Sequence, residues 1–420
     1  MKRTDLLSKA VICTVVSSIV FCVNAEFKTG SEPKHVPELM VTAAGEKVDS
    51  VEKWEKVRRG EILKTFKEEF YGVRPVERPA DLKFVEIAPV EECFGGKALR
   101  KRVKGTYSGP GGSSEFVFSV WIPKRDRPVA VFVHSSPRPA ESAADVNGPR
   151  PVYWLPAEDI VSRGYAVVAY CNQEIALDWH LADVATNGVF KVFGNAKLKE
   201  RKPTEWGILS AWAWGMSRIV DWIETEPLLD PKRIASVGLS RNGKTSLVAG
   251  ATDERFAMVV SCCSGCCGAK LNHMRCWESE TFKNLAHVVK WFAPNFLKYV
   301  GKDESPEMKF DQHQFLALVA PRLLYVSSAT EDAWAGPRGE FAAAALASPA
   351  WELYGRKGLV AKAPPAPDSP QQDGCISYHL RTGRHTLAPY DWKVYMDFAD
   401  RHGWVKGDAT CVQTAAKILY

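Results

Sequence analysis

Short apolar segments alternate along most of this chain with longer stretches of helical character. Five of the apolar segments have the length and composition of strands buried on both faces: residues 129–133, 165–170, 234–238, 257–261 and 323–327. Buried strands that alternate with helices are typical of a parallel sheet covered by helices on both faces. The pattern therefore predicts an α/β fold, a three-layer sandwich with a mostly parallel central sheet.

The chain before residue 129 has a different pattern. Apolar side chains recur near helical spacing over residues 51–72, which predicts an amphipathic helix. Residues 98–107 and 115–122 alternate in the manner of strands, and the glycine-rich sequence between them predicts a turn. We expect one catalytic domain over residues 26–420, in which residues 26–95 form a helical extension packed on the rest.

The first 25 residues have the pattern of a secretory signal. Lys2 and Arg3 precede an apolar stretch over residues 10–23, and small residues follow at the cleavage positions. The apolar stretch is too short to span a membrane. We expect a secreted or periplasmic protein without stable membrane insertion, and a short uncleaved anchor is the alternative.

Composition excludes several other classes of protein. Of the 420 residues, 46% are hydrophobic and 25% are charged, which excludes a disordered or low-complexity chain. The formal net charge is +6, and no run of five like charges occurs. Neither a nucleic-acid partner nor a polybasic membrane tether is expected.

The cysteines allow a metal interpretation, which we consider the weaker one. Removal of the signal leaves nine of the 11 cysteines, so at least one thiol is unpaired. Cys263 and Cys266 have ligand spacing, but tetrahedral zinc needs a second ligand pair, which Cys276 or His273 would have to complete. We expect buried thiols, some of them in disulfides, with no metal and no cofactor.

The strongest chemical signal is a serine at the end of a predicted strand. The sequence there is Val237-Gly238-Leu239-Ser240-Arg241-Asn242-Gly243-Lys244, followed by a predicted helix. A sharp strand-to-helix turn exposes such a serine above the sheet, which is the nucleophile elbow of α/β-hydrolases. Asn242 stands where the second glycine of the motif is usual, so a serine that only caps a helix remains an alternative on this motif alone.

Downstream residues supply the partners that a nucleophilic serine requires. In α/β-hydrolases the chain order is serine, acid, histidine. Asp332 follows the predicted strand 323–327, and His385 lies in a loop before the last helix, so the order is satisfied. We expect structural roles for His379 and His402. His134 follows the predicted strand 129–133 at the same sheet edge, where it could line the pocket.

Several short sequences resemble one known family, the glucuronoyl esterases. They are Glu205-Trp206-Gly207, Ala211-Trp212-Ala213-Trp214-Gly215, Ser240-Arg241-Asn242-Gly243-Lys244, Ser264-Gly265, Trp291-Phe292, Asp332-Ala333-Trp334 and Gly383-Arg384-His385. The resemblance extends over roughly residues 50–405, and Ser-Arg-x-Gly-Lys is its most specific part. Glucuronoyl esterases cut the ester between 4-O-methyl-glucuronate on xylan and lignin alcohols.

The resemblance implies roles for further residues. Arg241 is expected to stabilise the oxyanion, and Lys244, Glu278 and Trp334 are expected to contact the glucuronoyl group. A merely solvated surface charge is the alternative for Lys244 and Glu278. Many members carry an acidic residue directly before the Ser-Gly pair, where this chain has Cys263. The catalytic acid is therefore expected to be Asp332.

Together these features predict a secreted, metal-free serine esterase that acts on glucuronate esters of a polysaccharide or oligosaccharide, as in lignin-carbohydrate ester links. The protein is expected to be a monomer. Two alternatives are an acetyl or other carbohydrate esterase with the same triad, and a carbohydrate-binding protein without catalytic activity.

Overall fold

The computed structural model describes residues 36–140, 155–178, 186–194, 200–276, 278–301 and 308–405. The predicted signal peptide, residues 1–25, lies outside them. Within the described residues, no helix has both the length and the apolar character needed to cross a membrane.

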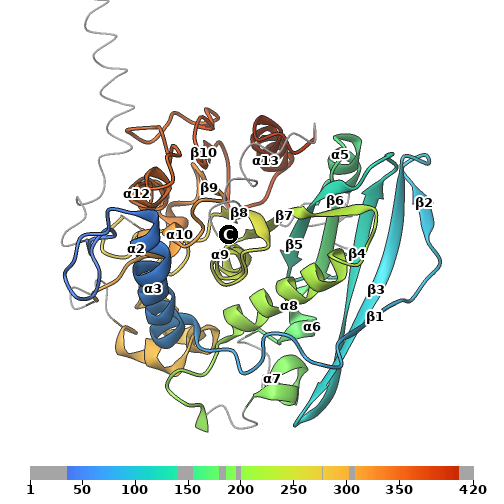
Figure 1. Ribbon diagram of the computed structural model, residues 1–420, viewed down its shortest axis with the longest axis horizontal. Coiled ribbons are helices and arrows are strands. Elements are labelled where there is room, and N and C mark those ends of the chain that lie inside the picture. Colours follow the sequence, from blue (N-terminus) through green and yellow to red (C-terminus); the bar gives the residue numbers. More distant parts are fainter. Residues whose placement is uncertain are drawn as a thin grey trace, which may run out of the picture.

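One sheet of ten strands forms the centre of the described structure (Figure 1). The strands are β1 (Lys83–Glu86), β2 (Glu91–Cys93), β3 (Ala98–Gly109), β4 (Gly112–Pro123), β5 (Val129–Ser136), β6 (Ala166–Cys171), β7 (Leu229–Leu239), β8 (Phe256–Cys262), β9 (Leu323–Ala329) and β10 (Ile376–Arg381). Their order is β1-β3-β4-β6-β5-β7-β8-β9-β10, with β2 beside β3. The strands from β6 to β10 are parallel, whereas β1, β3, β4 and β6 pair antiparallel.

Helices cover both faces of this sheet. The longer ones are α8 (Ile208–Ile223), α9 (Arg241–Thr252), α11 (Pro337–Leu346) and α13 (Pro389–Arg401). Shorter helices are α5 (Ala157–Ser162), α6 (Asn172–Ile175), α7 (Gly188–Phe193), η5 (Asn284–Trp291), η6 (Pro294–Lys298), α10 (Gln312–Ala317), η7 (Ala333–Ala335) and α12 (Pro349–Glu352). Figure 1 shows α8 and α9 on one side of the strands and α5 and α13 on the other. This confirms the predicted three-layer α/β arrangement.

The five apolar segments of the sequence all form sheet strands, and buried positions extend through β5, β6, β8 and β9. The predicted turn between residues 109 and 112 joins β3 to β4. Trp212 and Trp214 of α8 are fully buried, as is usual for aromatic residues on a core helix.

The N-terminal extension is only partly helical, so the prediction for residues 26–95 is wrong in part. Helical turns run without a break through α2 (Val51–Lys53), η1 (Trp54–Arg58), α3 (Arg59–Phe66) and η2 (Lys67–Tyr71). Beyond them β1 and β2 pair with β3 and enlarge the sheet, because their backbones complete the ladder of an otherwise open edge. Val57 is an apolar residue of the predicted helix, yet it is 41% exposed. It lies in η1, whose wider π-helical turns rotate its side chain away from the buried face.

Candidate active site

Ser240 stands at a sharp turn between β7 and α9. Its backbone has φ 61° and ψ −128°, and its N–H donates to the Cys262 carbonyl at 2.8 Å. Such positive φ is unfavourable for a non-glycine residue and persists only where the surrounding structure imposes it. A Cβ at Gly238 would lie 2.0 Å from the Asn242 carbonyl oxygen. The glycine therefore permits the strand and helix to approach closely at the elbow.

His385 and Asp332 form a hydrogen-bonded pair near this serine. Nδ1 of His385 lies 2.6 Å from Oδ2 of Asp332. Asp332 follows β9 and is 5% exposed, and its Oδ1 accepts the Ala335 N–H at 3.3 Å. His385 lies in the loop between β10 and α13, and with Ser240 it lines one cavity of about 160 Å³. The structure thus brings together the three residues that chain order singled out.

Arg241, next to the serine, is held at the cavity by two contacts. Its Nη1 donates to Oδ2 of Asp178 at 2.7 Å, and its guanidinium carbon lies 4.9 Å from the centroid of the Trp291 ring. Trp291 in turn donates its Nε1–H to Oδ1 of the same aspartate at 2.9 Å. Asp178 is 2% exposed, so this carboxylate fixes both side chains from below the surface.

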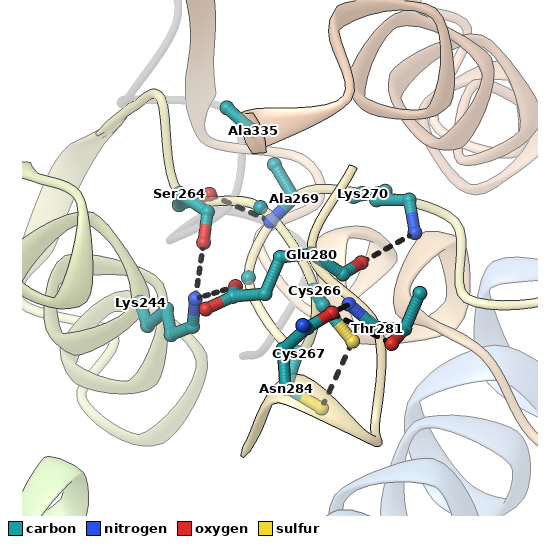
Figure 2. A network of polar contacts seen from close by, with 12 residues as sticks. Lys244, Ser264, Cys266, Cys267, Ala269, Lys270, Glu280, Thr281, Asn284 and Ala335 are labelled. Atoms are coloured by element: carbon teal, nitrogen blue, oxygen red, sulfur yellow. Dashed lines mark hydrogen bonds and ion pairs between the residues drawn. The ribbon is translucent and has the colours of Figure 1, made fainter. Parts of the chain in front are cut away.

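Lys244 lies one helical turn after the serine and also lines the cavity. The side chain is 3% exposed, and its Nζ donates to the Ser264 carbonyl at 2.5 Å and to Oε2 of Glu280 at 2.8 Å. Figure 2 shows Lys244 between these two partners. The alternative of a solvated surface charge is therefore wrong for Lys244.

Glu280, not Glu278, is the glutamate of the cavity, which corrects the prediction. Glu278 is exposed and adopts φ 58° in a turn, and it does not line the cavity. Glu280 lines it, because its N–H donates to the Trp334 carbonyl at 2.8 Å and this bond fixes the segment beside the site. Trp334 lines the same cavity and is 48% exposed, so its aromatic face is available to a ligand.

The cysteine-rich loop after β8 holds thiols in the structure. Seven of the described cysteines are free thiols, namely Cys93, Cys171, Cys262, Cys263, Cys266, Cys267 and Cys276. Cys266 contacts Asn272, and His273 pairs with Asp311 through Nδ1 at 2.7 Å. In the described part of the chain, residues 263, 266, 273 and 276 do not come together as a group of possible metal ligands. Cys263 lines the cavity, and the neighbouring Cys262 sulfur and burial raise the pKa of its thiol.

The three other histidines considered from the sequence, His134, His379 and His402, do not line the cavity. His134 is fully buried against Trp392 and does not line the cavity, and burial lowers its pKa to about 4. The structure therefore does not place His134 in the wall of the pocket, the alternative that its position after β5 left open. His379 is buried on β10 with Nε2 2.8 Å from Asp391, and His402 follows the end of α13, so both positions fit structural roles.

A buried carboxylate supports the loop after β8. Oε1 of Glu340 accepts the N–H groups of Ser264 at 2.7 Å and Gly265 at 3.0 Å, and Oε2 accepts the Ser328 hydroxyl at 2.6 Å. Burial raises the pKa of Glu340 to about 7. Since Ser264 and Gly265 line the cavity, helix α11 determines part of its wall.

A mostly parallel sheet with helices on both faces and a serine at such an elbow defines the α/β-hydrolase class. The family described as "Glucuronyl esterase, fungi" matches residues 142–355. The chain is 34% identical over 407 residues to carbohydrate esterase MZ0003 from an unknown prokaryotic organism, a match covering 88% of this chain and 90% of that protein. It is 31% identical over 204 residues to a 4-O-methyl-glucuronoyl methylesterase of Podospora anserina, covering 46% of this chain and 40% of that one.

A solved glucuronoyl esterase from Solibacter usitatus superposes with a TM-score of 0.79 at 32% identity, over 89% of this chain and 98% of that chain. The chain therefore belongs to the glucuronoyl esterase family. It is a carboxylic ester hydrolase, and glucuronate esters are its class of substrate.

Three residues of this site could not be found from the sequence. Asp178 carries no motif and lies 62 positions before the serine, so nothing in the sequence connects it to Arg241. Glu280 stands two residues from the glutamate that family spacing favoured. His287 of η5 is exposed and lines the cavity, but an isolated histidine in a helical stretch gives no signal.

Proposed function

We propose that Ser240 is the nucleophile, His385 the general base and Asp332 the acid that orients it. A neutral serine hydroxyl attacks an ester only when a base takes its proton, and such a base contributes typically ~10²–10⁴-fold. The short His385–Asp332 contact supports the assignment, because it holds Nδ1 protonated and leaves Nε2 free to accept the proton.

The reaction proceeds in two steps. Ser240 Oγ bonds to the uronate carbonyl carbon, its proton passes to His385, and the alcohol leaves with that proton. Water then attacks the acyl-enzyme with the same assistance, which releases glucuronate and restores the serine. Arg241 supports the oxyanion through its guanidinium and through its backbone N–H at the start of α9, and one such donor is worth ~10²–10³-fold.

The sugar is recognised by Lys244, Glu280 and Trp334. A glucuronoyl ring presents hydroxyl groups, which need directional donors and acceptors, and apolar C–H faces, which pack on an aromatic ring. The buried Lys244–Glu280 pair at the cavity wall is the observation that favours a uronate ester over a simple acetyl ester. An acetyl group has no hydroxyl group that could hydrogen-bond to Lys244 or to Glu280.

We further propose that the natural substrate is a glucuronate ester of glucuronoxylan, as in lignin-carbohydrate links, and that the enzyme is a secreted or periplasmic monomer. The open rim of the cavity, with Trp334 half exposed, supports a substrate that extends beyond the enzyme surface. A cytoplasmic enzyme would not meet such a polymer.

Single and combined variants test the triad. We expect Ser240→Ala and His385→Ala each to abolish hydrolysis of methyl glucuronate ester, and the double variant to be no worse, because the residues act as one unit. Asp332→Asn should lower kcat by up to ~10⁴-fold, because it favours the wrong imidazole tautomer. Circular dichroism verifies folding. More than a tenth of parental activity in either alanine variant contradicts the proposal.

A further inference from the structure

The sulfur of Cys263 lies close to the His385–Asp332 pair, and the three side chains together offer ligands for a metal ion. Possible ligand atoms of Cys263, Asp332 and His385 all lie within 4.8 Å of one another. Cys263 and Asp332 are buried, and His385 is partly exposed. Esterase chemistry needs the imidazole and the carboxylate but makes no use of the thiol, so the presence of sulfur at this point requires another explanation.

A thiol, a carboxylate and an imidazole form a donor set that suits Zn²⁺ and the related ion Cd²⁺. Zinc sites with three protein ligands keep a fourth position for water, and the bond lengths are ~2.0–2.3 Å. Ligand atoms around such an ion are about 3–4 Å apart, so the group closes with side-chain movements of about 1 Å. Hard ions such as Mg²⁺ prefer oxygen ligands and do not fit.

The surroundings of the group favour binding. Cys263 and His385 both line the cavity, so an ion has a path from solvent and room for a water ligand. The backbone of Cys263 is held at φ 45°, with its N–H bonded to the Ser327 carbonyl at 2.7 Å. The Ala335 N–H holds the other oxygen of Asp332. Two of the three ligands are thus oriented in advance, which lowers the cost of binding.

We propose that Cys263, Asp332 and His385 form an inhibitory site for Zn²⁺ or Cd²⁺. The ion bonds to the Cys263 sulfur, whose proton goes to solvent, to an Asp332 oxygen and to Nδ1 of His385. The proton of Nδ1 moves to Nε2. An imidazole protonated at Nε2 cannot accept the proton of Ser240, so the ion stops catalysis while it is bound.

Inhibition rests on the proposed triad, whereas binding does not, so the two are measured separately. Binding is measured on Ser240→Ala by titration with Cd²⁺ under a non-thiol reductant. The ultraviolet thiolate-to-Cd²⁺ charge-transfer band reports a bond to sulfur, and calorimetry gives the stoichiometry. We expect one ion per chain with this band, and we expect neither in Ser240→Ala/Cys263→Ser. A band that persists in the double variant overturns the proposal.

Inhibition is measured on the parent enzyme and on variants that keep Ser240. The rate with Zn²⁺ is divided by the rate without it, so that differences in basal activity between variants cancel. Removal of one ligand should raise the inhibition constant at least tenfold in Cys263→Ser and in Cys263→Ala. Cys276→Ser removes another buried thiol outside the group and should retain the parental constant. A chelator should restore activity, and Mg²⁺ should have no effect. Equal inhibition of parent and both Cys263 variants overturns the proposal.

The two arms separate the possible failures. A Ser240→Ala protein that binds Cd²⁺ through Cys263, beside a parent enzyme that Zn²⁺ does not inhibit, would retain the metal site and contradict the role of His385. A parent enzyme with a working triad and no charge-transfer band would contradict the metal site alone.

Discussion

Two non-glycine residues that line the cavity together with His385 have positive φ, Ser240 at 61° and Cys263 at 45°. Each such conformation costs of order 1–3 kcal/mol and persists only where neighbouring structure fixes it. Both residues end a central strand, Ser240 after β7 and Cys263 after β8, and both line the cavity. Backbone strain is therefore concentrated where side chains must project from the sheet edge toward a ligand.

Residue types in chain order were enough to predict Ser240, Asp332 and His385. Ser240 and Asp332 each follow a strand that the apolar pattern reveals, and His385 lies in the loop before the last helix. Glu278 could not be separated from Glu280 in this way. The choice depends on which side chain of a turn faces inward, and the hydrogen bond from Glu280 to the distant Trp334 carbonyl decides it. Asp178 could not be identified from the sequence for the same reason, since its partners Arg241 and Trp291 come from other elements.

Loss of the Lys244 charge should impair recognition and spare chemistry. We expect Lys244→Met to raise KM for methyl glucuronate ester roughly tenfold or more, because a charged hydrogen bond is worth about 1.5–3 kcal/mol. Hydrolysis of a small activated acetate ester should hardly change. Steady-state kinetics on both esters measure the difference.

The variant also leaves Glu280 buried without its cation, which destabilises the fold. The double variant Lys244→Met/Glu280→Gln removes both charges and is the control for that effect. It should be more stable than the single variant yet equally poor on the glucuronate ester. An equal fall on both esters would assign Lys244 to chemistry or folding.

At the scale of elements, α11 links Asp332 to the cavity wall. It begins shortly after Asp332, and Glu340 in its first turn holds Ser264 and Gly265 by their N–H groups. Sequence reasoning did not single out this helix, because its alanine-rich pattern has no chemical motif and a glutamate on a helix is usually exposed.

Glu340 should make stability depend on pH. Its pKa is about 7 in the folded protein and near the ordinary value of 4.5 when unfolded. The folded state therefore binds the extra proton between about pH 4.5 and 7, and its free energy of unfolding falls as pH rises through this window. Glu340→Gln keeps acceptor and donor groups and removes the titration. The free energy of unfolding of Glu340→Gln minus that of the parent should therefore rise by a few kcal/mol from pH 5 to 8, because only the parent loses stability from this titration.

Denaturant unfolding at several pH values measures this difference. Glu352, on α12, is exposed, and Glu352→Gln serves as the control that should show no such trend. A difference between Glu340→Gln and parent that is constant or falls with pH would mean that the carboxylate is ionised throughout the window.

The strand-to-helix elbow should not tolerate a methyl group at Gly238. Its Cβ would lie 2.0 Å from the Asn242 carbonyl oxygen, so β7 and α9 must separate. We expect Gly238→Ala to destabilise the protein by about 1–3 kcal/mol or more and to lower kcat, because the shift moves Ser240. Thermal unfolding and steady-state kinetics measure both effects.

Gly60 is the matched control for this substitution. It lies in α3, and a Cβ there would meet no atom within 4 Å. Gly60→Ala should stabilise the protein by about 0.5–1 kcal/mol and leave kcat unchanged, since alanine is the better helix former. If Gly238→Ala kept the stability and activity of the parent, the elbow would have more room for a Cβ than the 2.0 Å approach to the Asn242 carbonyl oxygen indicates.

At the scale of the molecule, sheet order assembles the site. Ser240, Cys263, Asp332 and His385 follow β7, β8, β9 and β10, which are consecutive neighbours in the sheet. Parallel strands end at the same edge, so residues more than 140 positions apart meet there. The apolar pattern predicted the layers and the parallel strands β5 to β9, but not β10. It could not predict that β1 and β2 join the sheet, because short polar strands at an edge have little periodicity.

The N-terminal helical segment, α2 to η2, packs on the loops that carry the cavity. Phe70 of η2 is fully buried, with ring centroids 4.9 Å from Phe310 and 5.3 Å from Phe296. The next residue, Tyr71, donates its hydroxyl to the Cys267 carbonyl at 2.9 Å. These contacts indicate that the segment folds with the catalytic domain as one unit.

Phe70→Ala tests whether the N-terminal helical segment unfolds together with the catalytic domain. Removal of a buried phenyl ring typically costs about 3–5 kcal/mol. If residues 51–71 belong to the single cooperative core, the variant should lose that stability in one transition, and esterase activity and tryptophan fluorescence should be lost together on denaturation. Val57→Ala alters an exposed side chain of the same helical segment and should change stability by less than about 0.5 kcal/mol. An early fluorescence change with full retention of activity would instead mean that the N-terminal segment unfolds separately, because the catalytic sheet would then be stable without it.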